Sequence, residues 1–166
     1  MKEKTAGKMR NIVFYVLLST LFAGVITSII LGEKQDKRFA QDSQLFNQAN
    51  NELKQGNFSK SESVYNQLIT KHSNSYILLW RYALSLSGQG KYKEANQYFL
   101  KAREIRPFLL RNPQFLAQYG ESLYRSGDYK KAERYLIESQ KISIQAGSPS
   151  SPVIEAILLD TQKKLK

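Results

Sequence analysis

The chain has 166 residues, no cysteine and one histidine, and both shortages restrict its chemistry. Without cysteine it has no disulfide, no thiolate metal ligand and no cysteine for a bacterial lipid anchor. The absence of cysteine permits an oxidising compartment but does not require one. The histidine, His72, lies in a turn-like KHSNS segment without clustered carboxylates. This pattern predicts an exposed turn residue and no metal site.

Motifs of catalysis are also missing. No serine lies in a nucleophile-elbow context, and no glycine-rich phosphate loop occurs. We therefore expect no enzyme activity and no cofactor.

The charge is strongly unbalanced, with 25 basic and 14 acidic residues and a net charge of +11. Beyond residue 38 the basic residues are scattered and interleaved with glutamates, and no arginine-rich helix, zinc-finger spacing or aromatic RNA-binding motif accompanies them. The excess predicts a solvated positive surface that suits anionic lipid headgroups, and no nucleic-acid partner.

Residues 11–32 form a run without any charged side chain. A bilayer core needs roughly 20 apolar helical residues, whereas a signal-peptide core has roughly 7–15 and ends at a small-residue cleavage site. The run is longer than such a core and lacks that site, so it predicts one uncleaved transmembrane helix. Residues 1–10 are then a basic tail, and residues 33–41 a short polar linker.

The basic residues beside this run predict its orientation. Four precede it and three follow closely: Lys2, Lys4, Lys8 and Arg10, then Lys34, Lys37 and Arg38. The excess in front favours a cytoplasmic N-terminus. We therefore expect a single-pass protein of the cell membrane whose remaining residues are extracytoplasmic.

A short signature recurs three times after the apolar run: GNFSKS at 56–61, GKYKEA at 90–95 and GDYKKA at 127–132. The first two glycines are 34 residues apart, and the last two are 37 residues apart. Self-similarity at such a period predicts stacked helical hairpins that bury their apolar faces against one another.

Each repeat carries the residues that a helical hairpin needs. The glycine suits a turn with positive φ. Small residues allow two helix axes to approach closely, as in the pairs Ala83 with Ala95 and Gly120 with Ala132. An aromatic ring two residues after each glycine is expected to fill the gap between the helices. The first repeat departs from the pattern, with Ser61 where the others have alanine.

This pattern resembles the tetratricopeptide repeat (TPR), a helix–turn–helix of about 34 residues. The resemblance implies an all-α fold: a three-repeat TPR α-solenoid behind the transmembrane helix, with repeats at about 42–75, 76–109 and 113–146. A loop to residue 151 and an amphipathic C-terminal capping helix at 152–166 follow. The stripe expected to cover the last repeat is Ile154, Ile157, Leu158 and Leu165.

In this family the first helices of the repeats line a concave groove that commonly holds a peptide or a partner's helix. The resemblance therefore implies a protein-binding groove, with these candidate residues: Phe46, Asn50, Trp80, Arg81, Leu84, Gln118, Glu121 and Arg125. Trp80 and Arg81 are the residue types that dominate interface energetics, although Trp80 also suits core packing.

Some family members bind the C-terminal carboxylate of heat-shock chaperones with a set of lysine, asparagine and arginine residues. Only Asn50 matches that set. Phe46 replaces the first lysine, Arg81 replaces the next asparagine, and glutamines 114 and 118 replace the last pair. The sequence therefore argues against recognition of chaperone tails.

Two functions remain open at this point. The first is a membrane-tethered adaptor or scaffold that binds a protein partner in its groove, in the assembly of an envelope or secretion complex. The second is a permanently assembled structural subunit of a membrane complex. The small-residue spacings Ser19–Ala23 and Gly24–Ser28 would suit helix contacts in such a complex. The sequence leaves the oligomeric state open.

Overall fold

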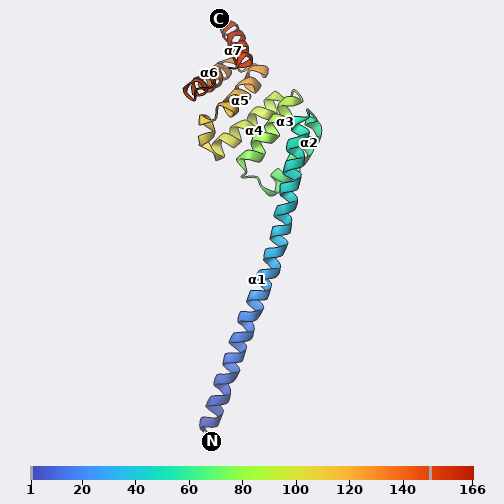
Figure 1. The fold of residues 1–166 in the computed structure, drawn as a ribbon, viewed down its shortest axis with the longest axis vertical. Helices are drawn as coiled ribbons and strands as arrows, with labels where there is room; N and C mark the ends of the chain where they lie inside the picture. The colour runs from blue at the N-terminus through green and yellow to red at the C-terminus, as the bar shows by residue number, and fades with distance from the viewer. Residues whose placement is uncertain (1, 150) are drawn as a thin grey trace. The chain divides into compact units, whose positions relative to one another are not determined.

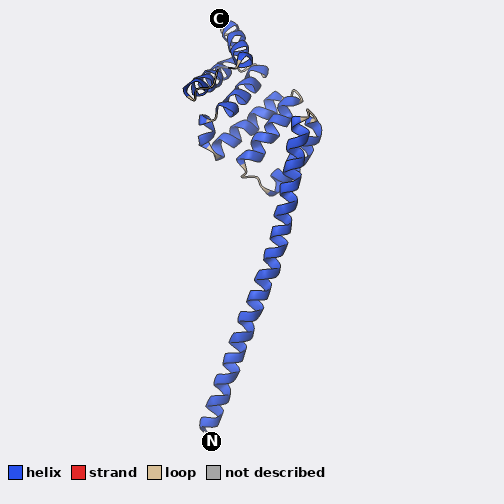
Figure 2. Cartoon of the chain, in the orientation of Figure 1, coloured by secondary structure: helices blue, strands red, loops and turns tan. Residues whose placement is uncertain are grey.

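The computed structural model describes residues 2–149 and 151–166, and every regular element in these ranges is helical (Figure 2). The helices, in chain order, are α1 (Lys2–Lys54), α2 (Phe58–Lys71), α3 (Tyr76–Gly88), α4 (Tyr92–Ile105), the 3₁₀ helix η1 (Pro107–Arg111), α5 (Pro113–Arg125), α6 (Tyr129–Gln145) and α7 (Pro152–Lys164) (Figure 1). The chain divides into two compact units, and the second is Leu45–Lys166.

The first unit contains most of α1, including a segment long and apolar enough to cross a membrane. All large apolar side chains from Val13 to Leu31 are exposed. The hydroxyls of Ser19, Thr20, Thr27 and Ser28 donate to helix carbonyls three or four residues earlier. Such bonds satisfy polar groups without water, as an apolar environment requires.

The predicted linker at 33–41 is helical and continuous with the residues on both sides. The expectation of a separate linker followed from its charged composition. However, Glu, Lys, Gln, Arg and Ala all favour helix, and the segment contains no glycine or proline to end one. High polarity alone therefore does not interrupt a helix.

The three signature glycines lie in the predicted turns. Gly56, Gly90 and Gly127 have φ of 79°, 78° and 88°, a region that costs other residues free energy. At Gly90 the amide donates to the Ser87 carbonyl at 3.0 Å, and the next amide donates to the Leu86 carbonyl at 3.0 Å. This Schellman pattern ends α3, and the same pairs recur at the other two glycines.

The predicted small residues lie where paired helices approach. Ala83, Ala95 and Ala132 are fully buried. A Cβ atom on Gly120 would lie 2.8 Å from Cγ of Leu136 on the facing helix α6, so α5 needs glycine there. Ser61, the exception in the first repeat, is also fully buried, and its hydroxyl lies 2.8 Å from that of Ser85. A hydrogen-bonded pair of serines thus replaces the alanine of the other repeats.

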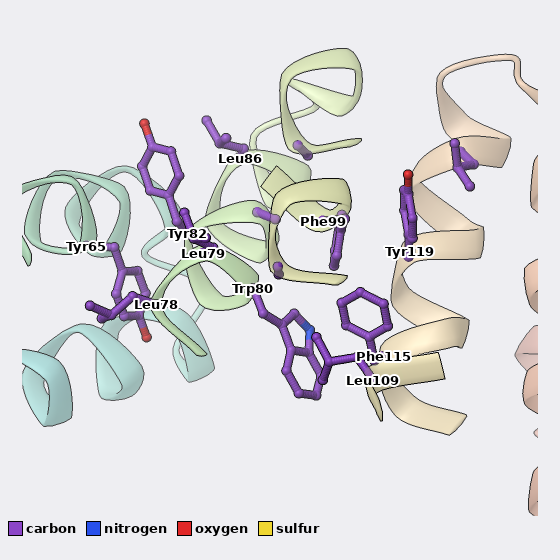
Figure 3. Packing of buried hydrophobic residues seen from close by; sticks show 14 of the residues in the cluster. Tyr65, Leu78, Leu79, Trp80, Tyr82, Leu86, Phe99, Leu109, Phe115 and Tyr119 are labelled. Carbon is purple, nitrogen blue, oxygen red and sulfur yellow. The ribbon is translucent and has the colours of Figure 1, made fainter. Parts of the chain in front are cut away.

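The core of the second unit is aromatic (Figure 3). The ring of Phe99 stacks on Tyr119 with centroids 5.1 Å apart and meets Phe115 edge-on at 5.8 Å. Such rings bury large areas, and their edge-to-face pairs add about 0.5–1.5 kcal/mol each. This packing holds α4 against α5 and so sets the position of the segment between them, which includes η1.

The C-terminal helix α7 packs on α6 and α5. Ile154, Ile157 and Leu158 are half-buried as predicted, but Leu165 is 43% exposed because it lies at the end of the helix. Thr161, which the apolar pattern did not select, is the fully buried residue of α7. Its hydroxyl donates to the Ile157 carbonyl at 2.6 Å, so burial leaves no unsatisfied donor.

Candidate protein-interaction site

The predicted groove residues of the first repeat pack against α2. The ring of Phe46 lies 6.1 Å from that of Tyr65 in an edge-to-face arrangement. Oδ1 of Asn50 accepts a hydrogen bond of 2.9 Å from the Tyr65 hydroxyl. Burial raises the pKa of Tyr65 to about 12, so the hydroxyl keeps its proton and remains a donor. Asn50 is therefore occupied within the first repeat.

Trp80 lies in the core, with 9% of its surface exposed. Its indole ring meets Phe115 edge-on at 5.3 Å, and its Nε1 donates to Oε1 of Gln118 at 2.8 Å. Two predicted groove residues thus bind each other. Leu84 is half-buried against the same core. Most of the surface of Trp80 is buried, so Trp80 is mainly a core residue.

The last two predicted groove residues lie further along α5. Glu121 and Arg125 form an ion pair of 3.6 Å, four residues apart on the helix. The guanidinium of Arg125 lies 5.9 Å from the ring centroid of Tyr124. Arg125 borders a shallow hollow beside the turn at Gly90, which none of the other predicted residues lines.

The eight predicted residues therefore do not line one cavity. Trp80 and Arg81 alone among them line a cavity of about 480 Å³ between the N-terminal half of α3, the segment from Arg106 to η1, and the start of α5. Its remaining wall consists of aromatic, apolar and basic side chains with one asparagine: Tyr76, Ile77, Arg106, Phe108, Leu109, Arg111, Asn112 and Pro113.

The wall formed by η1 was not predicted from the sequence. The available signal was the spacing of the repeats, because the interval from Gly90 to Gly127 is 37 residues whereas the preceding interval is 34. The longer interval contains η1, which Pro107 opens at its first position. Proline fixes φ near −65° and suits the first turn of a helix.

The position of η1 is held from both ends. Leu109 is 5% exposed and anchors η1 in the core, beside Trp80 in Figure 3. After η1, Oδ1 of Asn112 accepts a hydrogen bond of 2.9 Å from the Phe115 amide and caps α5. Between these anchors, Phe108 remains 62% exposed. The chain thus presents an aromatic ring to solvent on a constrained segment.

Three guanidinium groups border the cavity, each over an aromatic ring. Arg81 lies 5.5 Å from the centroid of Trp80, Arg106 lies 5.8 Å from that of Tyr76, and Arg111 lies 5.6 Å from that of Phe108. No acidic side chain is found among the described residues that line the cavity. Among the described side chains, those of residues 13–149 and 151–166, no ion pair is recorded between any of the three and a carboxylate.

Arg81 has an additional unsatisfied donor. Its Nε is buried and has no hydrogen-bond partner in the described part of the chain. A buried donor without a partner costs about 1–3 kcal/mol. The wall therefore combines apolar rings with three cationic side chains, and one of these, Arg81, carries a donor that the described residues do not satisfy.

His72 is exposed, as its turn position predicts. In the described ranges, no group of three or more histidine and acidic side chains is arranged to hold a metal ion.

Residues 46–109 match the family model described as tetratricopeptide repeat. A search of curated proteins gave no significant match.

Solved structures show the same fold. One is the Sgt2 TPR domain from Aspergillus fumigatus, with 19% identity, a TM-score of 0.60 and coverage of 75% of this chain and 79% of that one. Another is the type III secretion chaperone SycD of Yersinia enterocolitica in complex with a peptide of the translocator YopD, at 16% identity, TM-score 0.59 and coverage of 75% and 94%. A third is the first TPR of Spaghetti (RPAP3) bound to an HSP90 peptide, at 13% identity, TM-score 0.62 and coverage of 75% and 92%. The chain is an all-helical protein with a TPR-like solenoid.

Proposed function

We propose that the protein is a membrane-tethered TPR adaptor that binds a segment of a protein partner in the cavity between α3, η1 and α5. The observation that carries this proposal is the wall of that cavity. Tyr76, Ile77 and Phe108 offer apolar surface, and three arginines offer positive charge, with the buried Nε of Arg81 lacking a hydrogen-bond partner among the described residues. Aromatic and arginine side chains are enriched among the residues that contribute most binding energy at interfaces.

Structural relatives support a peptide as the occupant. The SycD structure contains a translocator peptide, and the RPAP3 structures contain HSP90 and HSP70 peptides. Ligand cavities in proteins commonly measure about 300–1,000 Å³. The cavity of about 480 Å³ therefore suits a few side chains of a peptide.

The membrane tether is the second part of the proposal. It rests on the uncharged run at 11–32 and on the exposed apolar side chains that this part of α1 carries. A lipid environment would remove these side chains from water, which stabilises them by about 25 cal/mol per Å². The basic excess in front of the run favours an extracytoplasmic repeat domain. Such a domain would serve the assembly of an envelope or secretion complex.

A permanently assembled structural subunit is the second candidate function. The observation that favours it is the exposed apolar surface of the last helices, away from the cavity: Ile144, Val153 and Leu159 are 58%, 64% and 57% exposed. Permanent interfaces are richer in apolar surface than transient ones. In that case these side chains, and not the cavity, would contact the partner.

Site-specific photo-crosslinking in cells that express the full chain separates the two functions. A photoreactive amino acid replaces Ile77 in the cavity wall, Leu159 on α7, or the exposed Lys130 on α6 as a control. An adaptor should give partner adducts from position 77 and none from position 130. Adducts from position 159 with none from position 77 would favour the structural subunit and contradict the adaptor.

A further inference from the structure

We infer that the cavity between α3, η1 and α5 selects an acidic segment of its partner, with a carboxylate bound by Arg81, Arg106 and Arg111 and a neighbouring apolar side chain against Phe108. This inference rests on the proposed function, since it specifies the chemistry of the segment that the adaptor binds.

The cavity is positively charged. Three arginines border it, and no acidic side chain is found among its described lining residues. Arg106 and Arg111 are exposed and Arg81 is half-buried, and all three border the space that a ligand would enter. A carboxylate is the acceptor that matches the planar fork of a guanidinium, and charge-assisted hydrogen bonds are about twice as strong as neutral ones. An acidic ligand would therefore supply the negative charge that the described lining of the cavity lacks.

The aromatic rings beside the arginines favour an orientation that suits a ligand. Arg106 lies near two rings, 5.8 Å from the centroid of Tyr76 and 6.0 Å from that of Phe108. A cation–π contact uses the face of the guanidinium, so the N–H groups at its edge stay available to a ligand. The rings also restrict the arginine side chains, which lowers the entropy lost when a carboxylate binds.

Exposed apolar surface lies beside the arginines. Phe108 is 62% exposed although it lies on a segment anchored by Leu109 and Asn112. Ile77, on the opposite wall, is also exposed. A ligand that supplied charge alone would leave both side chains in water. A peptide with an apolar residue near its acidic residue would cover them.

This arrangement differs from the chaperone-tail site described for the family. Asn50 is the residue that matches that site, and it is bonded to Tyr65. Two of the three arginines here, Arg106 and Arg111, lie outside the first helices and in the longer repeat interval. The same arginines beside an exposed Phe108 would also suit an anionic lipid headgroup, but the concave, aromatic wall favours a peptide. Binding of a lipid in place of a peptide is therefore one of the outcomes that the experiment distinguishes.

The experiment selects peptides from a random phage-displayed library on the full chain in detergent micelles. Affinities of the selected peptides, made synthetically, are measured through the fluorescence of Trp80, the single tryptophan of the chain and part of the cavity wall. We expect aspartate or glutamate to be enriched within a few residues of leucine or an aromatic residue. Replacing these acids by their amides should weaken binding at least about tenfold.

Charge-removing variants locate the site. Arg106→Gln and Arg111→Gln should each weaken binding by about tenfold, and both side chains are exposed, so the fold should persist by circular dichroism. Arg134→Gln is the matched control, because it removes the same charge from exposed surface of α6, away from the cavity. Equal loss from all three variants would indicate a general charge effect and overturn the inference.

The remaining outcomes separate this inference from the proposed function. Selected peptides without acidic enrichment, whose binding is lost in Ile77→Asp, would leave the adaptor in place and overturn its acidic preference. No selected peptide at all would contradict both. Monomeric short-chain phosphatidylglycerol serves as the lipid probe. If it binds in an Arg106-dependent manner while acidic peptides do not, the arginines recognise lipid and the inference fails.

Discussion

The indole Nε1 of Trp80 donates a hydrogen bond of 2.8 Å to Oε1 of Gln118, which lies 38 residues further along the chain. The bond joins α3 to α5, the first helices of the second and third repeats. The sequence analysis assigned both residues to a groove that contacts a partner. In the structure they stabilise the domain and, through Trp80, also form one wall of the cavity.

Trp80→Ala should destabilise the domain by about 3–5 kcal/mol, because it removes a large buried ring and leaves a cavity. Trp80→Phe retains most of the ring but removes the bond to Gln118, and should cost less, about 1–3 kcal/mol. The free energy of unfolding of both variants is measured by urea unfolding of the full chain in micelles, monitored by circular dichroism. Lys93→Ala, on the exposed surface of α4, is the control. If Trp80→Ala unfolded like the control, Trp80 would not be a core residue.

Ala95→Leu and Ala132→Leu should each destabilise the domain by about 1–3 kcal/mol, because both alanines are fully buried where two helices approach. Thermal unfolding checks the effect. Ala156→Leu makes the same chemical change on the exposed surface of α7 and should be nearly neutral. Unchanged melting of the two buried variants would contradict the helix packing described above.

The buried serine pair allows a double-mutant cycle. The hydroxyls of Ser61 and Ser85 form a hydrogen bond of 2.8 Å. In addition, the Ser61 hydroxyl lies 3.0 Å from the Phe58 carbonyl, and the Ser85 hydroxyl lies 3.2 Å from the Arg81 carbonyl. Ser61→Ala and Ser85→Ala should therefore each cost about 1 kcal/mol or less. The double variant should lose less than the sum, since either single change already removes the shared bond. Strictly additive losses would show that the pair contributes nothing.

Stability should fall at alkaline pH. Burial raises the pKa of Tyr65, Tyr82 and Tyr119 from 10.0 to about 12. Because the folded-state pKa exceeds the unfolded value, the contribution of each tyrosine is complete below pH 10.0. It is then lost as the pH rises toward about 12. Melting temperature and tyrosinate absorbance measured along this range check the expectation.

Tyr65→Phe is the variant that isolates one of these groups. It removes one titrating hydroxyl and the bond to Asn50, so it should lose about 0.5–1.5 kcal/mol at neutral pH and show a smaller alkaline loss. If the variant lost as much stability at alkaline pH as the unmodified chain, ionisation of Tyr65 would not contribute to that loss.

The predicted topology can be tested in membranes. The full chain should sediment with them and resist extraction by high salt or carbonate, because the run at 11–32 would be inserted. A protease added outside intact cells should digest the repeat domain. Full protection before lysis, followed by digestion afterwards, would reverse the orientation, and release by carbonate would contradict insertion.

Local chemistry explains why the repeats could be predicted from the sequence. Each glycine with positive φ, each small residue and each period of the apolar pattern acts within one helical hairpin, so the residues that cooperate are close in the chain. The polarity of residues 33–41 predicts a linker but not its conformation, which is helical because these residues favour helix. The groove residues were predicted by analogy with the family, and that analogy does not specify side-chain contacts.

The sequence by itself determined the TPR-like solenoid, because a repeated pattern of local signals leaves one way to bury every apolar face. Only the tertiary structure decided which side chains remain available at its surface. Trp80 forms a hydrogen bond with Gln118, Asn50 forms one with Tyr65, and the cavity lies between η1 and α3. These outcomes depend on how helices far apart in the chain pack and which rotamers that packing allows. Residue spacing therefore does not predict individual side-chain contacts between helices.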